Sequence, residues 1–448
     1  MARLQMFSRG IPRLLMMPAL LALAAGAASA TAQGGATEAG ERAARGQDAA
    51  GRGGVAHVAM LEISGNPGFR RGILDALTAG ADDEQLSMLE ILGRLRTVAT
   101  DDRYDGVVIR LKDAELGQTQ AQEIGRAIRR VREAGKKVQV FAEGYGAPEL
   151  LLGSHADQIL LQEGGVVSLP GMYMEEIYLG DTLRWIGVQP DFVQIGDYKG
   201  ASEQMARGGP SDEWSQNIEG LLDSLYANMR AQLSEGLGLS DRQLDAAMEQ
   251  AFMAYGGTAE RLGLIHATVD LPDLYDAIDE YYGADAQWTE LASAADAQDD
   301  MSAMMAANPL AGLMQIVELL EGPEPQRATA PAIAILTIDG AIVDGESGEG
   351  GPFGGEMTVG SRTIRNAIED ILDQDLIQGV IVRVDSPGGS AIASEVIWQG
   401  LRRLAEEKPV WVSIGSMAAS GGYYVSVAGE RIYVNPSSVV GSIGVVGG

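Results

Sequence analysis

The sequence predicts an α/β protein made of two tandem repeats with mainly parallel sheets and crossover helices. Apolar strand-like runs alternate with helical patterns in the first half, and the same order restarts at Ala332. Such alternation is typical of β–α–β crossovers, which join parallel strands. The chain has 448 residues, which is more than one ordinary hydrophobic core holds, so we expect at least two domains.

The first repeat is predicted to cover residues 55–284. Its expected strands and helices alternate up to residue 141, and the region after Lys199 is expected to be mostly helical. The predicted elements are strand 55–63, helix 83–98, strand 106–111, helix 118–134, strand 137–141, a strand-like run at 190–195, and helical segments at 212–250, 255–265 and 271–282.

The second repeat is predicted to cover residues 331–448, after a linker at 285–330 that contains an apolar helix at 309–320. Its expected elements are strand 332–338, helix 359–373, strand 379–384, helix 394–407 and strand 410–414. Lys137-Val-Gln-Val140 matches Lys408-Pro-Val-Trp-Val412 in pattern, at a separation of about 270 residues. The sequence therefore indicates an internal duplication.

The N-terminus has the pattern of an export signal over residues 1–30. Three arginines precede an uncharged run from Leu14 to Ala27, and Ala28-Ser-Ala30 offers small residues for cleavage. The run is shorter than the roughly 20 residues that a spanning helix needs, so a cleaved signal is favoured over an uncleaved anchor. Residues 31–54 are rich in Ala, Gly, Glu and Arg, which predicts a flexible tether.

Composition excludes several classes of function. The formal charge of −29 argues against nucleic acid as a partner, because phosphate binding needs clustered Lys and Arg. The chain has no cysteine, so disulfides, thiolate nucleophiles and cysteine metal sites are absent. Its three histidines, His57, His155 and His266, are isolated from one another. We therefore expect no metal and no cofactor.

Ser420 is the strongest candidate nucleophile. It lies in Ser416-Met-Ala-Ala-Ser420-Gly-Gly-Tyr-Tyr424, between an apolar strand and a helix-like run. A hydroxyl at such a turn lies beside free backbone N–H groups that can bind developing negative charge. Asp385-Ser-Pro-Gly-Gly-Ser390 also follows an apolar strand, and Gly388, Gly389 and Gly421 are candidate oxyanion donors. A plain glycine turn is the alternative interpretation of this motif.

A serine nucleophile needs a base, because a free hydroxyl is protonated at neutral pH. None of the three histidines lies in a turn cluster with an acidic partner, although proximity in the fold stays open. Lys199, in Gly196-Asp-Tyr-Lys199-Gly, is the other candidate. A lysine base must be neutral, which requires burial that lowers its pKa from about 10.4 towards 7 or 8. A solvated loop lysine is the alternative.

The duplication is asymmetric at the nucleophile. The first copy has Gly146-Ala-Pro-Glu149 where the second has Ala418-Ala-Ser420-Gly421. The first-half counterpart of Ser420 is predicted at or near Pro148, which has no hydroxyl. Only the second repeat is then expected to carry a nucleophile.

Four second-half motifs resemble the bacterial signal peptide peptidase A family, and the duplication with the Gly196-Asp-Tyr-Lys199 segment resembles its long, two-domain form. The four motifs are Asp385-Ser-Pro-Gly-Gly-Ser390, Met417-Ala-Ala-Ser-Gly-Gly-Tyr423, Asn435-Pro-Ser-Ser438 and Gly441-Ser-Ile-Gly444. The resemblance covers about residues 55–448 and implies a membrane-associated serine protease made of two Clp-protease/crotonase-like repeats. It also implies further helices beyond Gly448, so we expect the sequence to be a fragment or a truncated reading frame.

The resemblance implies roles for five residues. Ser420 is the nucleophile, Lys199 the base, Gly389 and Gly421 the oxyanion donors, and Ser442 the residue that orients the lysine. The family pattern after the lysine, Lys-Ser-Ala-x-Glu-Pro-Phe, is only partly matched by Lys199-Gly-Ala-Ser-Glu203-Gln-Met205. Glu203 is retained, whereas the serine and the Pro-Phe pair are not.

The expected substrates are remnant signal peptides and other unfolded or hydrophobic segments, handled by a homo-oligomer, a tetramer by resemblance. The expected location is the periplasm or the periplasmic face of the inner membrane, with membrane association through the N-terminus. Two alternatives remain at this point. One is a non-catalytic scaffold, which comparison with a C-terminally extended chain would distinguish. The other is a crotonase-type acyl-thioester enzyme, although the sequence contains no sign of an adenine-phosphate site.

Overall fold

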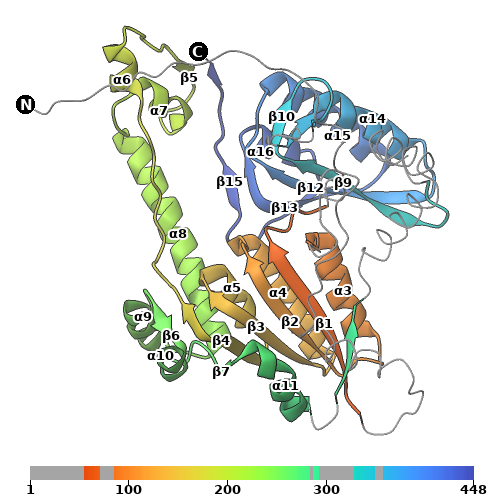
Figure 1. The fold of residues 1–448 in the computed structure, drawn as a ribbon. Coiled ribbons are helices and arrows are strands. Elements are labelled where there is room, and N and C mark those ends of the chain that lie inside the picture. Colours follow the sequence, from red (N-terminus) through yellow and green to blue (C-terminus); the bar gives the residue numbers. More distant parts are fainter. Residues whose placement is uncertain (1–54, 71–84, 283–285, 292–326, 349–356, 448) are drawn as a thin grey trace, which may run out of the picture. The chain divides into compact units, whose positions relative to one another are not determined.

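The computed structural model describes residues 55–70, 85–282, 286–291, 327–348 and 357–447 (Figure 1). The predicted export signal, the tether and the apolar helix at 309–320 lie outside the described residues. Residues 52–448 form one compact unit. In the described part of the chain, no helix combines the length and the apolar character needed to cross a bilayer.

The first repeat contains a seven-stranded sheet in the order β6-β4-β3-β2-β1-β8, with β7 also paired to β4. All pairs are parallel except β4 with β6. The strands are β1 (His57–Gly65), β2 (Gly106–Ala114), β3 (Lys137–Tyr145), β4 (Gln158–Val167), β6 (Ala254–Tyr255), β7 (Ala267–Val269) and β8 (Gln287–Glu290).

The helices of the first repeat include α3 and α4, which bury apolar side chains against this sheet in the larger core of the molecule. The helices are α3 (Met88–Thr100), α4 (Gln118–Glu133), α5 (Ala147–Gly153), α6 (Gly180–Trp185), η1 (Gly200–Ser202), α7 (Glu203–Ala206), α8 (Asp212–Leu237), α9 (Asp241–Gln250), α10 (Gly256–Arg261), η2 (Leu271–Asp273) and α11 (Leu274–Tyr282).

The second repeat contains a five-stranded, all-parallel sheet in the order β14-β13-β12-β9, with β15 also paired to β13. Helices α14 and α15 bury apolar side chains in a separate core. The elements are β9 (Ala332–Asp339), β10 (Ala341–Val343), β11 (Thr358–Gly360), α14 (Ser361–Leu372), β12 (Ile377–Ser386), α15 (Ala391–Glu407), β13 (Val410–Ala419), α16 (Gly421–Ser426), β14 (Arg431–Tyr433), β15 (Val439–Gly441) and β16 (Val446–Gly447).

The predicted class, α/β with mainly parallel sheets and crossover helices, is confirmed. Several boundaries differ for local reasons. Helix α15 begins three residues before the predicted start, because Ser390 caps it by accepting the N–H of Ala393 at 3.2 Å. The predicted helical region 212–250 is divided at Gly238, which ends α8 in the left-handed conformation with φ +65°.

The strand-like run at 190–195 is shorter than predicted. Only β5 (Val193–Gln194) forms, and its partner is β16 at the other end of the chain, in antiparallel register. The N–H of Ile195 also donates to the carbonyl of Val445 at 3.3 Å. Ile195 lies four residues before Lys199, so this contact with the C-terminal segment is close to the candidate base.

Helix α4 of the first repeat contacts the second sheet through polar side chains. Thr119 and Ser416 share a hydrogen bond of 2.7 Å, and Gln122 donates to Ser437 at 2.8 Å. The carboxylate of Glu123 forms a buried ion pair with Arg383 at 2.8 Å. These bonds fix α4 against β12 and β13, and Ser420 directly follows the last residue of β13.

Candidate active site

Ser420 occupies a strained turn between β13 and α16. Its φ of 52° and ψ of −113° lie in a region that residues with a side chain rarely adopt. The N–H of Ser420 donates to the carbonyl of Gly441 at 2.9 Å, and its carbonyl accepts the N–H of Tyr424. A serine on such a strand-to-helix elbow is typical of hydrolase nucleophiles. Strain at this position is therefore an independent pointer to Ser420.

The loop with Gly388 and Gly389 lies against this elbow. A Cβ on Gly388, whose φ is +96°, would lie 2.6 Å from the nitrogen of Gly421 and 2.8 Å from the Cβ of Ser420. A Cβ on Gly421 would lie 3.3 Å from the nitrogen of Gly389. The loop can come this close because neither glycine has a side chain.

The N–H groups of Gly389 and Gly421 are available to a ligand. Ile342 accepts the N–H of Ser390 and donates to the carbonyl of Gly388. The N–H between them, on Gly389, therefore faces the other way in this extended segment. Gly421 is the first residue of α16, where the backbone N–H has no intrahelical acceptor. Among the described residues, neither N–H has a protein acceptor.

Two residues of the glycine motif hold this loop, and the sequence analysis assigned them no role. The buried Ser386 hydroxyl accepts the N–H of Gly388 at 3.1 Å and donates to the carbonyl of Gly340 at 2.7 Å. The Asp385 carboxylate accepts the N–H groups of Ser416 and Met417 at 2.8 and 3.0 Å. Their place in Asp-Ser-Pro-Gly-Gly, directly after a strand, was the signal that could have identified them.

Lys199 is buried, with 8% of its surface exposed. Its Nζ donates to the Oγ of Ser442 at 2.8 Å and to the carbonyl of the same residue. Its methylene chain packs beside Gly444. Burial lowers the pKa of Lys199 below that of a free lysine. The shift has the direction that a general base requires.

The surroundings of Ser442 connect the lysine with the serine elbow. Gly441 accepts the N–H of Ser420 and precedes Ser442, which accepts from Lys199. Ser442 has φ 50°, so like Ser420 it has a positive φ, which is rare for residues with a side chain. Within the described residues, no hydrogen bond joins Lys199 directly to Ser420.

The departure from the family pattern after Lys199 has a structural explanation. A Cβ on Gly200 would lie 2.5 Å from the indole of Trp214, so the ring packs directly on the backbone beside the lysine. Trp214 in turn donates from its indole N–H to the carboxylate of Glu176 at 2.6 Å. An indole thus fills the space that a serine side chain at position 200 would enter.

The first repeat contains a filled counterpart of this site. Gly146 caps α5 after β3 as Ser420 caps α16 after β13, so Gly146, two residues before Pro148, is the structural counterpart. At this site, the N–H of Leu116 donates to the carboxylate of Glu149 at 3.2 Å. Leu116 immediately precedes the cap of α4, as Gly389 precedes the cap of α15. A carboxylate oxygen therefore occupies the place that corresponds to an oxyanion.

The histidines are engaged elsewhere. Burial and the nearby charges of Arg129, Arg132 and Arg126 lower the pKa of His155 to about 4. The Nδ1 of His266 accepts the N–H of Ile159 at 3.0 Å. Both lie in the first repeat, and none of the three histidines has a described hydrogen bond to Ser420.

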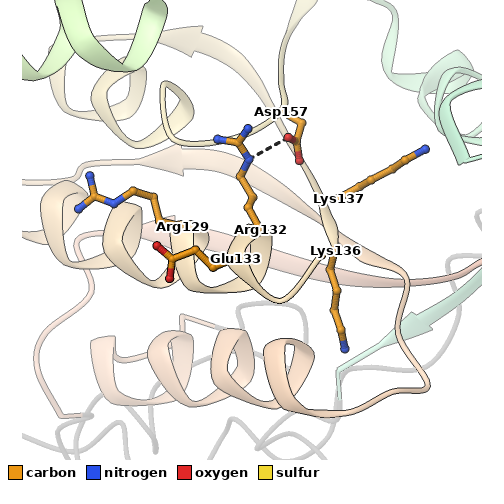
Figure 2. A pocket seen from close by; sticks show the side chains of 7 residues that line it. Arg129, Arg132, Glu133, Lys136, Lys137 and Asp157 are labelled. Atoms are coloured by element: carbon orange, nitrogen blue, oxygen red, sulfur yellow. Dashed lines mark hydrogen bonds and ion pairs between the residues drawn. The ribbon is translucent and has the colours of Figure 1, made fainter.

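A hollow of about 520 Å³ at the C-terminal end of α4 has a basic lining but belongs to a different region (Figure 2). Figure 2 shows Lys136 and Lys137 extending in different directions and Arg132 paired with Asp157. Lys136 donates to backbone carbonyls, and Lys137 donates to the carbonyl of Tyr281. Three of the lining cations, Arg132, Lys136 and Lys137, thus already have partners. Among the described residues, no cluster of His, Asp and Glu could hold a metal.

Comparisons with known proteins find a peptidase family and several proteases. Residues 130–297 and 402–448 match the model of Peptidase family S49. Protease 4 of Haemophilus influenzae is 30% identical over 81% of this chain and 56% of its own length. Protease 4 of Salmonella typhi is 29% identical over 87% of this chain and 61% of its own length.

A chloroplast protein of Arabidopsis thaliana named serine protease SPPA is 26% identical over 81% of this chain. It is covered over 50% of its length, so the chain spans about half to three fifths of these three curated relatives. Among solved structures, the 1510-N membrane-bound stomatin-specific protease matches 53% of this chain with 12% identity and a TM-score of 0.30.

Proposed function

We propose that this chain, an SppA-type protein with a Peptidase family S49 domain, is a serine endopeptidase that uses a Ser420–Lys199 dyad. The observation that carries the proposal is the lysine that reaches Ser442 from the other repeat. Lys199 is buried, has a lowered pKa and bonds to the residue after Gly441, which itself accepts the N–H of Ser420.

The proposed reaction begins with attack of the Ser420 Oγ on a peptide carbonyl carbon while the neutral Lys199 amine takes the hydroxyl proton. The N–H groups of Gly389 and Gly421 bind the oxyanion of the tetrahedral intermediate. The lysine ammonium then protonates the leaving amine, which gives an ester on Ser420. Water attacks this ester with Lys199 again as base, and the product acid leaves. Ser442 orients the lysine amine throughout.

The lysine must be neutral for the first step. The pKa of Lys199 is lowered by burial, which favours this neutral form. Burial of the ammonium form supplies a shift of this sign. Each oxyanion donor contributes about 2.7–4 kcal/mol to the stability of the transition state.

Proposed substrates are cleaved signal peptides and other unfolded, hydrophobic segments. Large apolar side chains flank the lysine and Ser442 and are exposed to solvent, among them Ile195, Tyr198 and Ile443. An extended peptide with apolar side chains would cover this surface while its backbone reaches Ser420. A water-soluble folded protein offers few such segments.

We further propose that the chain works as a homo-oligomer at the periplasmic side of the inner membrane, associated through its N-terminus. In the second sheet, Arg383 is covered by α4 through Glu123. In the first sheet, Arg110 pairs with Glu62, whose side chain is 42% exposed. This head-to-tail contact joins unlike surfaces, so it covers the face around Arg383 and leaves the corresponding face around Arg110 open. A second copy of the chain can cover the open face. Analytical ultracentrifugation of the chain tests this; a monomer at micromolar concentration would contradict it.

The test of the dyad is hydrolysis of a fluorogenic apolar peptide by Ser420→Ala and Lys199→Ala variants. Each is expected to lose activity by a factor of at least about 10³. A serine-directed phosphonate should label wild-type protein at Ser420. Full activity in either variant, or labelling at another serine, would refute the dyad.

A non-catalytic scaffold of the same fold is the second candidate, because among the described residues no hydrogen bond joins Lys199 directly to Ser420. Measuring the same hydrolysis for this chain and for a C-terminally extended relative separates the two. Activity only in the extended protein favours the scaffold. We assign no adenine-phosphate site that would support an acyl-thioester enzyme.

A further inference from the structure

A buried carboxylate, Glu203, holds the turn that carries Lys199. Glu203 begins α7 four residues after the lysine, and 6% of its surface is exposed. Its Oε2 accepts the N–H of Ser211 at 2.7 Å, and its Oε1 accepts the Ser211 hydroxyl at 2.5 Å. Ser211 caps α8 and accepts the N–H of Trp214 at 3.1 Å. Glu203 thus connects the lysine turn with the start of a helix of 26 residues.

The direction of this carboxylate matters for a lysine base. Lys and Glu four residues apart on a helical turn are neighbours that readily form an ion pair. In the described residues no ion pair joins Lys199 to Glu203. The charge of Glu203 lies at the N-terminus of α8, where the helix dipole favours an anion, and the Nε of Arg207 is 3.9 Å away. A carboxylate bonded to Lys199 would raise its pKa and keep it protonated.

The other charged groups near the lysine turn leave its amine without a counter-charge. Asp197 on the same turn is exposed, as are Asp212 and Glu213 in the first turn of α8. The second-repeat segment that touches the lysine, residues 442–444, contains no titratable side chain. Burial is the cause of the lowered pKa of Lys199. Its low pKa therefore depends on keeping the turn in place.

We infer that Glu203 is a positioning residue for Lys199. It anchors the lysine turn to the start of α8, so the amine stays buried beside Ser442 and Gly444, and it directs its own charge away from the amine. The inference rests on the proposed role of Lys199 as the base.

The test measures the protonation of Lys199 without relying on activity. Wild type and Glu203→Ala are treated with trace acetic anhydride from pH 6 to 11, and acetylation of Lys199 is quantified by mass spectrometry against the partly exposed Lys112. In Glu203→Ala, the turn loosens and water reaches the amine. The midpoint of Lys199 labelling should then rise by about one pH unit or more. The acid limb of kcat/KM should move in the same direction.

The matched control is Glu90→Ala. Glu90 accepts the N–H and the hydroxyl of Ser87, the cap of α3, at 2.8 and 2.7 Å. The chemistry is the same as at Glu203, but α3 carries no site residue. Glu90→Ala should lower stability without moving the Lys199 midpoint. Glu203→Gln, which keeps one acceptor oxygen, should raise the midpoint less than Glu203→Ala.

Two results would overturn the inference. An unchanged Lys199 midpoint in Glu203→Ala would leave Glu203 as a purely structural cap. A lower midpoint would make Glu203 a counter-ion of the lysine, because removing its charge would then favour the neutral amine. If Glu203→Ala fails to fold, Ser211→Ala must raise the midpoint instead. Failure of the dyad itself would appear separately, as hydrolysis that survives in Lys199→Ala or in Ser420→Ala.

Discussion

Replacing Glu123 by glutamine tests how α4 holds β12, the strand that pairs with β13 beside the proposed nucleophile. The Glu123 carboxylate lies 2.8 Å from the Nη1 of Arg383 and also accepts from Asn435 at 2.9 Å. Both charged side chains are about nine-tenths buried, at 8% and 10% exposure. The other described contacts of the guanidinium are a hydrogen bond to Ser413 at 3.1 Å and the ring of Phe69 at 4.7 Å.

Removing one partner from a buried ion pair typically costs about 3–5 kcal/mol, because the other charge stays buried without compensation. Glutamine keeps the volume and the contact with Asn435, so we expect a loss near the lower limit, about 3 kcal/mol in free energy of unfolding. Urea unfolding, followed by circular dichroism and tryptophan fluorescence together, measures it. Arg383→Met in the Glu123→Gln background should restore part of the loss, since the stranded charge is gone.

The control for this prediction is Glu369→Gln. Glu369 pairs with Arg403 at 2.7 Å, but both side chains are about half exposed, so its loss should cost less than about 0.5 kcal/mol. If Glu123→Gln costs no more than this control, the buried pair does not hold the two repeats together. The reasoning about α4 and β12 would then be refuted.

Three further changes have defined outcomes. Gly200→Ser should reduce kcat/KM and the unfolding temperature, because the new Cβ would meet the indole of Trp214 at 2.5 Å; unchanged values would show that the ring moves freely. Glu149→Ala should destabilise the first repeat by about 1–3 kcal/mol by leaving the N–H of Leu116 unpaired. Added acetate should restore part of the lost stability by supplying a carboxylate acceptor, whereas chloride at equal ionic strength should not. Burial and a neighbouring aspartate raise the pKa of Asp339 to about 6, so ionisation weakens the fold as pH rises from about 4 to 6. Asp339→Asn should therefore be more stable than wild type above pH 6 and should lose this advantage below about pH 4, and equal pH curves for the two proteins would contradict the shift.

The parts of the fold that depend on local pattern were predictable from the sequence. Alternating apolar runs identified the central strands of both sheets, and the helix at 118–134 was placed to within one residue of α4. Ser420 was located by its position between a strand and two glycines. Periodicity, capping and glycine turns all act over a few residues, so they leave a readable local signal.

The parts that depend on contacts between distant residues were not predictable. The pairing of β5 with β16 joins residues 193–194 to residues 446–447, and two such short segments carry no signal of their partner. The contact between Gly200 and Trp214 explains the missing serine after Lys199, but only the folded chain brings the ring there. The assignment of the serine counterpart at or near Pro148 was two residues off Gly146. Helices α5 and α16, which follow β3 and β13, begin with different residues, so a comparison of the two sequences does not align their caps.

The filled site of the first repeat suggests why a duplicated enzyme would divide its active site between two copies. A cradle of free N–H groups is costly to bury without an acceptor. In the second repeat a substrate oxyanion is proposed to meet this need during the reaction, whereas in the first repeat Glu149 meets it permanently. Once Gly146 stands where a hydroxyl would be needed, this cradle has no catalytic use, and an internal carboxylate stabilises it at no loss of function. The first repeat is then free to contribute the lysine, whose turn is anchored by α8 and Glu203 rather than by the serine elbow.

On this reasoning, restoring a serine at position 146 alone should give no second nucleophile. Phosphonate labelling of Gly146→Ser should remain confined to Ser420, and it should extend to residue 146 only if Glu149 is also removed and a base lies within reach.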